Sequence, residues 1–365
     1  MEDIAFLILC LLTIVNIKIK GFNQFFVDYM DLKNTNNIKG IFVWMILIKH
    51  YSEYYKKKYI YKMILNYFGQ KIVSLFLFYS SFGIYESIKN KGKNYIKTLP
   101  KKIIIIFIKS QLIILIFMLI NIILGIKIKL KTYLFSIIFR SAIGNSNWFA
   151  FTILALYFYS YISFIFIKNK NHFFFGILII NIISFFHIHL VYYYYYPKKI
   201  GTIDNILCFI IGFYYSLIKK YFDKIIMKND MLFYGFLSFT ILIYYYFYIY
   251  KIKTIFIVSI INAIFSLIVV FITMKIRFDN EFLKLLNSHS YSIYLLQRAV
   301  MIYISKKKYF ESNEFIRFFF EFSTIIFISI LFDNSTSFID KMFKKDLHKN
   351  DNYYCFEKKK YTTDI

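Results

Sequence analysis

Lys39 and His50 are the residues of this sequence whose types and spacing best suit chemistry at one site. They lie eleven positions apart in one apolar stretch, 39–55. In an α-helix, eleven residues turn to within roughly 20° of the starting direction and rise about 16 Å, so both side chains would lie on one helix face. A neutral imidazole can act as a general base or carry a group covalently, and a lysine can bind an anion. The alternative is that His50 lies near the outer end of its helix and is simply hydrated there.

The helices that position these residues must be membrane helices, because the chain is too apolar for a soluble domain. Of its 365 residues, 59% are hydrophobic and 18% charged, against about 45–50% and about 25% in soluble domains. The 46 Phe and 35 Tyr exclude a disordered chain, and three distant Cys exclude a disulfide scaffold. Apolar runs of about 17–25 residues predict membrane spans. They cover 3–19, 39–55, 67–88, 102–124, 146–167, 173–193, 203–218, 231–250, 254–274, 289–305 and 315–333.

The predicted fold class is therefore all-α: a polytopic membrane helix bundle of about ten to eleven transmembrane helices. Residues 1–38 would form an extra N-terminal transmembrane helix and loop, 39–333 the main membrane domain, and 334–365 a basic, loosely ordered cytoplasmic tail. The apolar segment 132–143 is too short to span, and we expect it to be interfacial or re-entrant.

The net charge of +26 comes from lysines clustered between apolar runs. This pattern is typical of loops beside anionic membrane lipids, and no RNA-binding signature accompanies it, so nucleic acid is not an expected partner. Loops 89–102 and 219–230 and the tail would share one side, which the positive-inside rule makes cytoplasmic. The C-terminus would then be cytoplasmic and the N-terminus outside. Two basic segments contradict this rule, since they would face outward: loop 56–66, with Lys56, Lys57, Lys58 and Lys62, and the run Lys306, Lys307 and Lys308.

Several segments resemble, in the same order, motifs of the acyltransferase-3 family of bacterial integral membrane acyltransferases. In that family a basic residue, usually Arg, precedes a His by eleven positions, and here Lys39 precedes His50. The ordered set covers about 39–300. Its other members are Leu77–Gly83, with Ser81 where Gly is usual, the basic entry Tyr95–Ile103, Asn147–Phe149, Asn205–Gly212, and Ser290–Gln297, with Gln297 where many members have His.

The resemblance implies a membrane O-acyltransferase of the cell envelope. It would move an acyl group, commonly acetyl, from cytosolic acyl-CoA to a hydroxyl of a cell-surface carbohydrate or its lipid-linked precursor. No bound cofactor is expected, because acyl-CoA is a co-substrate. The expected catalytic residues are His50 and Lys39, and the expected donor-binding residues are Lys97, Lys101 and Lys102. The expected cavity and substrate residues are Ser80, Ser81, Asn147, Trp148, Tyr294 and Gln297.

Two other readings stay open. A transporter or flippase for a lipid-linked saccharide would also need a polar path lined by aromatic and basic residues, although no internal repeat of the transporter type is visible. A catalytically inactive family member would fit the departures at Lys39, Ser81 and Gln297. No metal site is expected, because His187 and His189 are two residues apart and would face different sides of one helix.

Overall fold

The computed structural model is a helix bundle and describes residues 2–55, 60–167, 169, 172–195, 204–249, 254–307, 309–310 and 313–360. Two short strands, β1 (Lys18–Ile19) and β2 (Ile276–Arg277), pair antiparallel. The helices are α1 (Glu2–Ile14), α2 (Leu32–Tyr54), α3 (Ile60–Lys91), α4 (Lys93–Ile96), α5 (Leu99–Ile123), α6 (Leu130–Ile137), α7 (Asn147–Ile165), α8 (Phe173–Tyr195), α10 (Ile206–Ile226), α11 (Asp230–Ile249), α12 (Ile255–Lys275), α13 (Glu281–Ser288), α14 (Ser290–Lys307) and α15 (Glu314–Lys360).

A membrane helix bundle is confirmed, but the predicted count of ten to eleven spans is not. Within the described residues, six helical stretches are long and apolar enough to cross a membrane. They correspond to the predicted spans in α5, α7, α8, α11, α12 and the first part of α15. The predicted spans in α2, α10 and α14 are helices as well. Charged residues lie within them, for example Lys49 and Glu53 in α2 and Arg298 in α14.

Several predicted boundaries are wrong. The span 3–19 is a helix only over 13 residues, or about 20 Å, because Asn16 turns into the left-handed region at φ 61° and the chain continues as β1. The basic segment 89–102 is not a loop, since α4 and the start of α5 occupy most of it. The segment 219–230 is likewise mostly α10. Where the tail is described, it continues α15, which runs through Lys360; residues 361–365 lie outside the described part.

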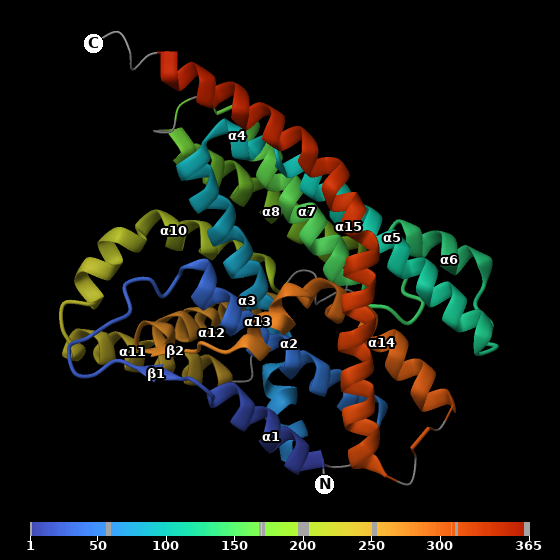
Figure 1. Cartoon of the computed structure of the whole chain (residues 1–365). Helices are drawn as coiled ribbons and strands as arrows, with labels where there is room; N and C mark the ends of the chain where they lie inside the picture. Colours follow the sequence, from blue (N-terminus) through green and yellow to red (C-terminus); the bar gives the residue numbers. More distant parts are fainter. Residues whose placement is uncertain are drawn as a thin grey trace.

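Helix α3 lies at the centre of the bundle (Figure 1) and packs against α10, α2 and α12. The long α15 packs on α14, α5 and α1. It begins at the end of the molecule where the N-terminus lies and ends near the C-terminus, at the opposite end (Figure 1). The eight-residue α6 follows α5 and is too short to span a membrane, as expected for 132–143.

Small residues allow two of the closest helix contacts. At Gly212 of α10, a Cβ atom would overlap the hydroxyl of Ser81 and the carbonyl oxygen of Phe78, both in α3. At Gly40 of α2, a Cβ atom would overlap the carbonyl of Leu283 in α13. Close approach between membrane helices depends on such small residues, because apolar burial alone does not drive helices together in lipid. Ser81 and Gly212 are thus packing partners.

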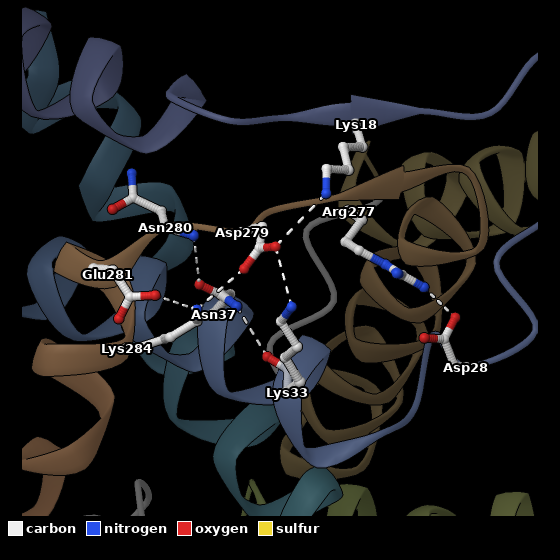
Figure 2. Close-up of polar contacts among 9 residues, drawn as sticks. All are labelled: Lys18, Asp28, Lys33, Asn37, Arg277, Asp279, Asn280, Glu281 and Lys284. Atoms are coloured by element: carbon white, nitrogen blue, oxygen red, sulfur yellow. Dashed lines mark hydrogen bonds and ion pairs between the residues drawn. The ribbon is translucent and has the colours of Figure 1, made fainter.

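The strand pair fastens the N-terminal segment to the connection between α12 and α13, beside the start of α2. Beyond the strands, Lys20 N donates to Lys275 O at 2.9 Å and Phe26 N donates to Met274 O at 2.8 Å. The Asn37 side chain accepts from Asn280 N at 3.1 Å and donates to Lys33 O at 2.9 Å (Figure 2). The first turns of α2 are therefore held against the segment that leads into α13.

Asp279 is the centre of a charged cluster in the same place (Figure 2). Its carboxylate lies 3.1 Å from Nζ of Lys284, 3.1 Å from Nζ of Lys33 and 3.7 Å from Nζ of Lys18. The hydrogen bonds from Lys284 and Lys33 lower the pKa of Asp279 to about 2. Since the unfolded value is about 3.9, the resulting stabilisation is complete above about pH 4 and is lost as the pH falls toward 2.

Gly212→Ala is predicted to destabilise the protein by about 1–3 kcal/mol, because α3 and α10 must separate to admit the methyl group. Gly235→Ala is the matched control, since nothing lies within 4 Å of a Cβ atom there and alanine favours a helix interior by up to about 1 kcal/mol. Thermal melting of the purified proteins in one detergent measures both. Equal melting temperatures for the two variants would show that the α3–α10 contact tolerates the methyl group.

Asp279→Asn is predicted to lower the melting temperature at pH 7 by about 1–2 °C, a small effect because the cluster is solvent-accessible. The difference from wild type should close as the pH falls from about 4 toward 2, where the wild-type carboxylate also loses its charge. Glu281→Gln serves as the control, because Glu281 is highly exposed and pairs with Lys284 alone among the described residues. A pH-independent difference would mean that the charge of Asp279 is not the cause.

Candidate functional site

A cavity of about 370 Å³ lies between α2, α3, α5, α7 and the α13–α14 segment. Lys39 lines it, and Val43 and Ile46 follow on the same face of α2 at the fourth and seventh positions. Among the other lining residues are Val73, Phe76, Ser80, Ile106, Phe149, Ile153, Tyr157, Asn287, Ser290, Tyr291, Ile293, Tyr294 and Gln297. The site is thus mainly apolar, with one cation and several neutral polar groups.

Lys39 lies deeper in its helix than the sequence suggested. The predicted span began at Lys39, but α2 begins at Leu32, so Lys39 is about two turns inside it. Its Nζ lies 5.7 Å from the centroid of the Tyr79 ring. No carboxylate of the described residues lies within 4 Å of this nitrogen. A cation without a counter-ion in a mainly apolar cavity favours an anionic ligand.

His50 continues the same helix face, eleven residues beyond Lys39, and is only 8% exposed. Its ring meets the Tyr294 ring edge-on at a centroid distance of 6.4 Å, and Tyr294 lines the cavity. The imidazole therefore lies beside the cavity, behind a shared aromatic wall, and the predicted common face of Lys39 and His50 is observed.

Two residues that the sequence did not single out hold the imidazole. His50 Nδ1 lies 3.0 Å from Glu53 Oε2, and Arg298 Nη2 lies 2.9 Å from His50 Nδ1 and 2.8 Å from Glu53 Oε2. Nδ1 either donates to Glu53 or accepts from Arg298, because the guanidinium can only donate. In the tautomer whose Nδ1 donates to Glu53, the lone pair of Nε2 is available as a base, and Arg298 donates to Glu53 and offsets its charge. The position of Glu53, three residues after His50, could have indicated this pair. Arg298 is 248 residues from His50, and no sequence pattern points to it.

Three of the six predicted cavity residues line the cavity: Ser80, Tyr294 and Gln297. The Ser80 hydroxyl lies 3.3 Å from the Tyr157 hydroxyl. Gln297 is fully buried and donates to Tyr294 O at 2.9 Å, and its Oε1 accepts no hydrogen bond from the described residues. An unpaired buried acceptor is costly, so a donor group of a ligand would be favoured at Gln297.

The other three do not line it. Ser81 is fully buried, donates to Phe78 O at 2.9 Å and packs on Gly212. Asn147 ties the start of α7 to the preceding segment, donating to the Ser136 hydroxyl at 3.0 Å and to Ser141 O at 2.6 Å. Trp148 packs edge-on against Phe149, one step behind the cavity wall.

The predicted donor-binding lysines do not line the cavity, although Lys102 interacts electrostatically with the lining residue Tyr157. Lys97 is exposed in the turn between α4 and α5. Lys101 and Lys102 lie in the first turn of α5, and Lys102 Nζ donates to the Tyr95 hydroxyl at 3.0 Å. These three lysines form a basic end of the bundle and do not reach into the cavity.

A second imidazole–carboxylate pair was missed by sequence reasoning. His289 Nδ1 lies 2.6 Å from Asp333 Oδ2, and the Ser292 hydroxyl donates to Asp333 Oδ1 at 2.6 Å. Lys109 lies 3.0 Å from Asp340 and 4.0 Å from Asp333. This network joins α5, α14 and α15 and does not line the cavity. Within the described ranges, no three His, Cys, Asp or Glu side chains group as metal ligands would.

The site therefore combines a cation in a cavity, a buried histidine with a carboxylate partner on the same helix, and an apolar wall between them. Comparison with known proteins adds no assignment: no family, no curated protein and no solved structure matches this chain.

Proposed function

We propose that this chain is a membrane O-acyltransferase that moves an acyl group, commonly acetyl, from cytosolic acyl-CoA to a hydroxyl of a cell-surface carbohydrate or its lipid-linked precursor. The observation that carries the proposal is the single face of α2, on which Lys39 lines the cavity and His50 lies beside it. The motifs that resemble the acyltransferase-3 family point to the same pair of residues.

The described groups suit acyl transfer from a thioester. His50, with Nδ1 donating to Glu53, accepts the proton of the acceptor hydroxyl at Nε2 while the hydroxyl oxygen attacks the thioester carbonyl carbon. The carbon–sulfur bond then breaks, and the imidazolium returns the proton to the leaving thiolate. Acyl-CoA and an alcohol become an ester and free CoA, so atoms and charge balance without another reactant.

Lys39 fits the donor side of this reaction. Its uncompensated charge in the cavity attracts an anionic part of the donor, and the Oε1 atom of Gln297 accepts from an amide N–H of the donor arm. The two residues thereby orient the thioester toward His50. Lys97, Lys101 and Lys102 would attract the nucleotide end at the basic entrance.

The proposed location is the bacterial cytoplasmic membrane, as a multi-pass protein with a cytoplasmic C-terminus. The arrangement of the basic segments and the N-terminus supports this orientation. The lysine-rich α4 region and the C-terminal end of α15 lie toward one end of the molecule, and the N-terminus lies at the other (Figure 1). The positive-inside rule then makes the lysine-rich end cytoplasmic.

His50→Ala should lower acyl transfer by about 10²–10⁴-fold, because the general base is lost. The assay follows transfer of radiolabelled acetyl from acetyl-CoA to a glycan acceptor by purified protein, together with release of free CoA. Glu53→Gln should cause a smaller loss in kcat and move the pH–rate profile, since its role is to hold the imidazole. His189→Ala is the control, because His189 is exposed on α8.

Near-normal transfer by the His50 variant would remove the assignment of this residue. Saccharide flux across vesicles without consumption of acyl-CoA would favour a transporter or flippase. Neither flux nor transfer by the wild-type protein would favour an inactive member of the family.

Lys39→Met should raise the apparent KM for acyl-CoA, whereas Lys39→Arg should retain substantial activity because the charge survives. Removing a half-buried charge that has no carboxylate partner among the described residues should not lower the melting temperature, so lost activity would not reflect unfolding. Lys220→Met, an exposed lysine of α10, is the control. If the Lys39→Met variant keeps the KM and kcat of the wild type, Lys39 does not take part in donor binding.

A further inference from the structure

A second cavity, of about 420 Å³, lies on the other side of α14 from the first. Helices α5, α14 and α15 and the turn after α14 enclose it, and it has no charged side chain in its described lining. We call it the α14 groove. It is lined by Ile116, Ile120, Leu296, Ala299, Val300, Tyr303, Ile304, Tyr309, Phe310, Phe320, Thr324 and Ile328.

The α14 groove lies among helices whose composition suits the hydrocarbon layer of a membrane. Two of its three helices, α5 and α15, are among the stretches long and apolar enough to cross a membrane. Water finds almost no hydrogen-bond partners on this lining, and an empty groove would forfeit dispersion contacts along its walls. The chemistry of the lining and its surroundings therefore favours a hydrocarbon chain as occupant.

One end of the groove has the features of a membrane–water interface. Tyr309 and Phe310 are 47% and 41% exposed, and such aromatic residues are common at the level of lipid headgroups. Phe310 adopts a left-handed φ of 56°, unusual for an aromatic residue, and its ring packs on Phe320 with centroids 5.0 Å apart. The turn thus directs aromatic side chains onto the rim of the groove.

Two lysines stand at this end. Lys306 and Lys307 are exposed, and they lie in the chain between the lining residues Ile304 and Tyr309. Neither forms an ion pair with a described carboxylate. They are among the residues that contradict the positive-inside rule, because the predicted orientation puts them outside. An anionic lipid headgroup would explain both their position and their lack of a protein partner.

We propose that the α14 groove binds an anionic glycerophospholipid, with one acyl chain along the groove and the phosphate at Lys306 and Lys307. Transfer of a chain from bilayer to groove has little hydrophobic driving force, so selectivity comes from the headgroup. A basic side chain near an anionic lipid contributes about fivefold in affinity, the equivalent of about 1 kcal/mol. The two lysines together should favour an anionic over a zwitterionic lipid by up to about 30-fold.

The groove shares a wall with the candidate site. Gln297 and Tyr294 of α14 face the first cavity, whereas the neighbouring Leu296 and Val300 face the α14 groove. A bound lipid would therefore support the helix that carries Arg298, the residue that contacts His50 and Glu53. The binding proposal itself does not depend on the acyltransferase function.

Lipid titration of the full-length protein tests the proposal. Delipidated protein in a neutral detergent is titrated with phosphatidylglycerol or with phosphatidylcholine of the same chains, and the melting temperature is followed. We expect phosphatidylglycerol to stabilise the protein at about 30-fold lower concentration. A combined Lys306→Gln and Lys307→Gln variant should lose that preference, while the same changes at the exposed Lys91 and Lys93 should retain it.

A matched pair of variants tests the groove. Thr324→Phe places a large side chain in its lining, and Ser323→Phe places the same side chain at the exposed neighbouring position. Only Thr324→Phe should abolish stabilisation by phosphatidylglycerol. Equal titrations with the two lipids, a preference that survives loss of both lysines, or normal lipid binding by Thr324→Phe would each overturn the proposal. The proposal would also be overturned if the protein were a dimer and Thr324→Phe made it a monomer without changing lipid binding. The groove would then be a contact between two copies of the chain.

Discussion

A charged side chain inside a membrane protein must be met by an opposite charge, a hydrogen-bond partner or a cavity, and much of this structure depends on that constraint. Lys275 and Asp230 form a buried pair at 2.5 Å between α12 and α11. Lys109 lies between two aspartates of α15. His50, Glu53 and Arg298 form a compact group where α2 meets α14. Each group joins helices that apolar surface alone would not hold in one register, since lipid competes equally well for apolar faces. Lys39 differs, because its charged group lines the first cavity and has no carboxylate within 4 Å among the described residues.

Close packing and polar pairing act together on helix α2. Gly40 lets α2 approach α13, and the Asn37–Asn280 contact and the Asp279 cluster hold the preceding turns against the same segment. The rotation of α2 about its own axis is thereby set. That rotation turns Lys39, Val43 and Ile46 toward the cavity and places His50 beside Tyr294. The position of the candidate base is thus a consequence of contacts about 16 Å away along the helix.

The two faces of α14 have different chemistry, and this division links the candidate site to the membrane. The face with Tyr294 and Gln297 supplies polar groups to the first cavity, and the face with Leu296 and Val300 is apolar apart from the hydroxyl of Tyr303. Arg298 lies between them and contacts the histidine of α2. A helix in this position can be held by lipid on one side while its polar groups meet substrate on the other. This combination is suited to an enzyme whose acceptor and donor meet at a membrane.

The class of structure and the helix face that carries Lys39 and His50 could be predicted from the amino-acid pattern alone. Long apolar runs predict membrane helices because their backbone groups must be paired internally in lipid, and the eleven-residue spacing places Lys39 and His50 on one face. The sequence did not determine the helix ends, because charged residues such as Lys89 and Lys219 look like loop residues. In the structure they pair with Glu86 and Asp223 one turn away on their own helices, and Lys89 also donates to Ser216 O of α10. The sequence also wrongly predicted Ser81, Asn147 and Trp148 as cavity residues. An evenly apolar sequence does not indicate which side of a helix faces the cavity. Only the tertiary structure brought Arg298 to His50 across 248 residues and separated the two cavities of α14, because those contacts depend on how helices distant in the chain pack together.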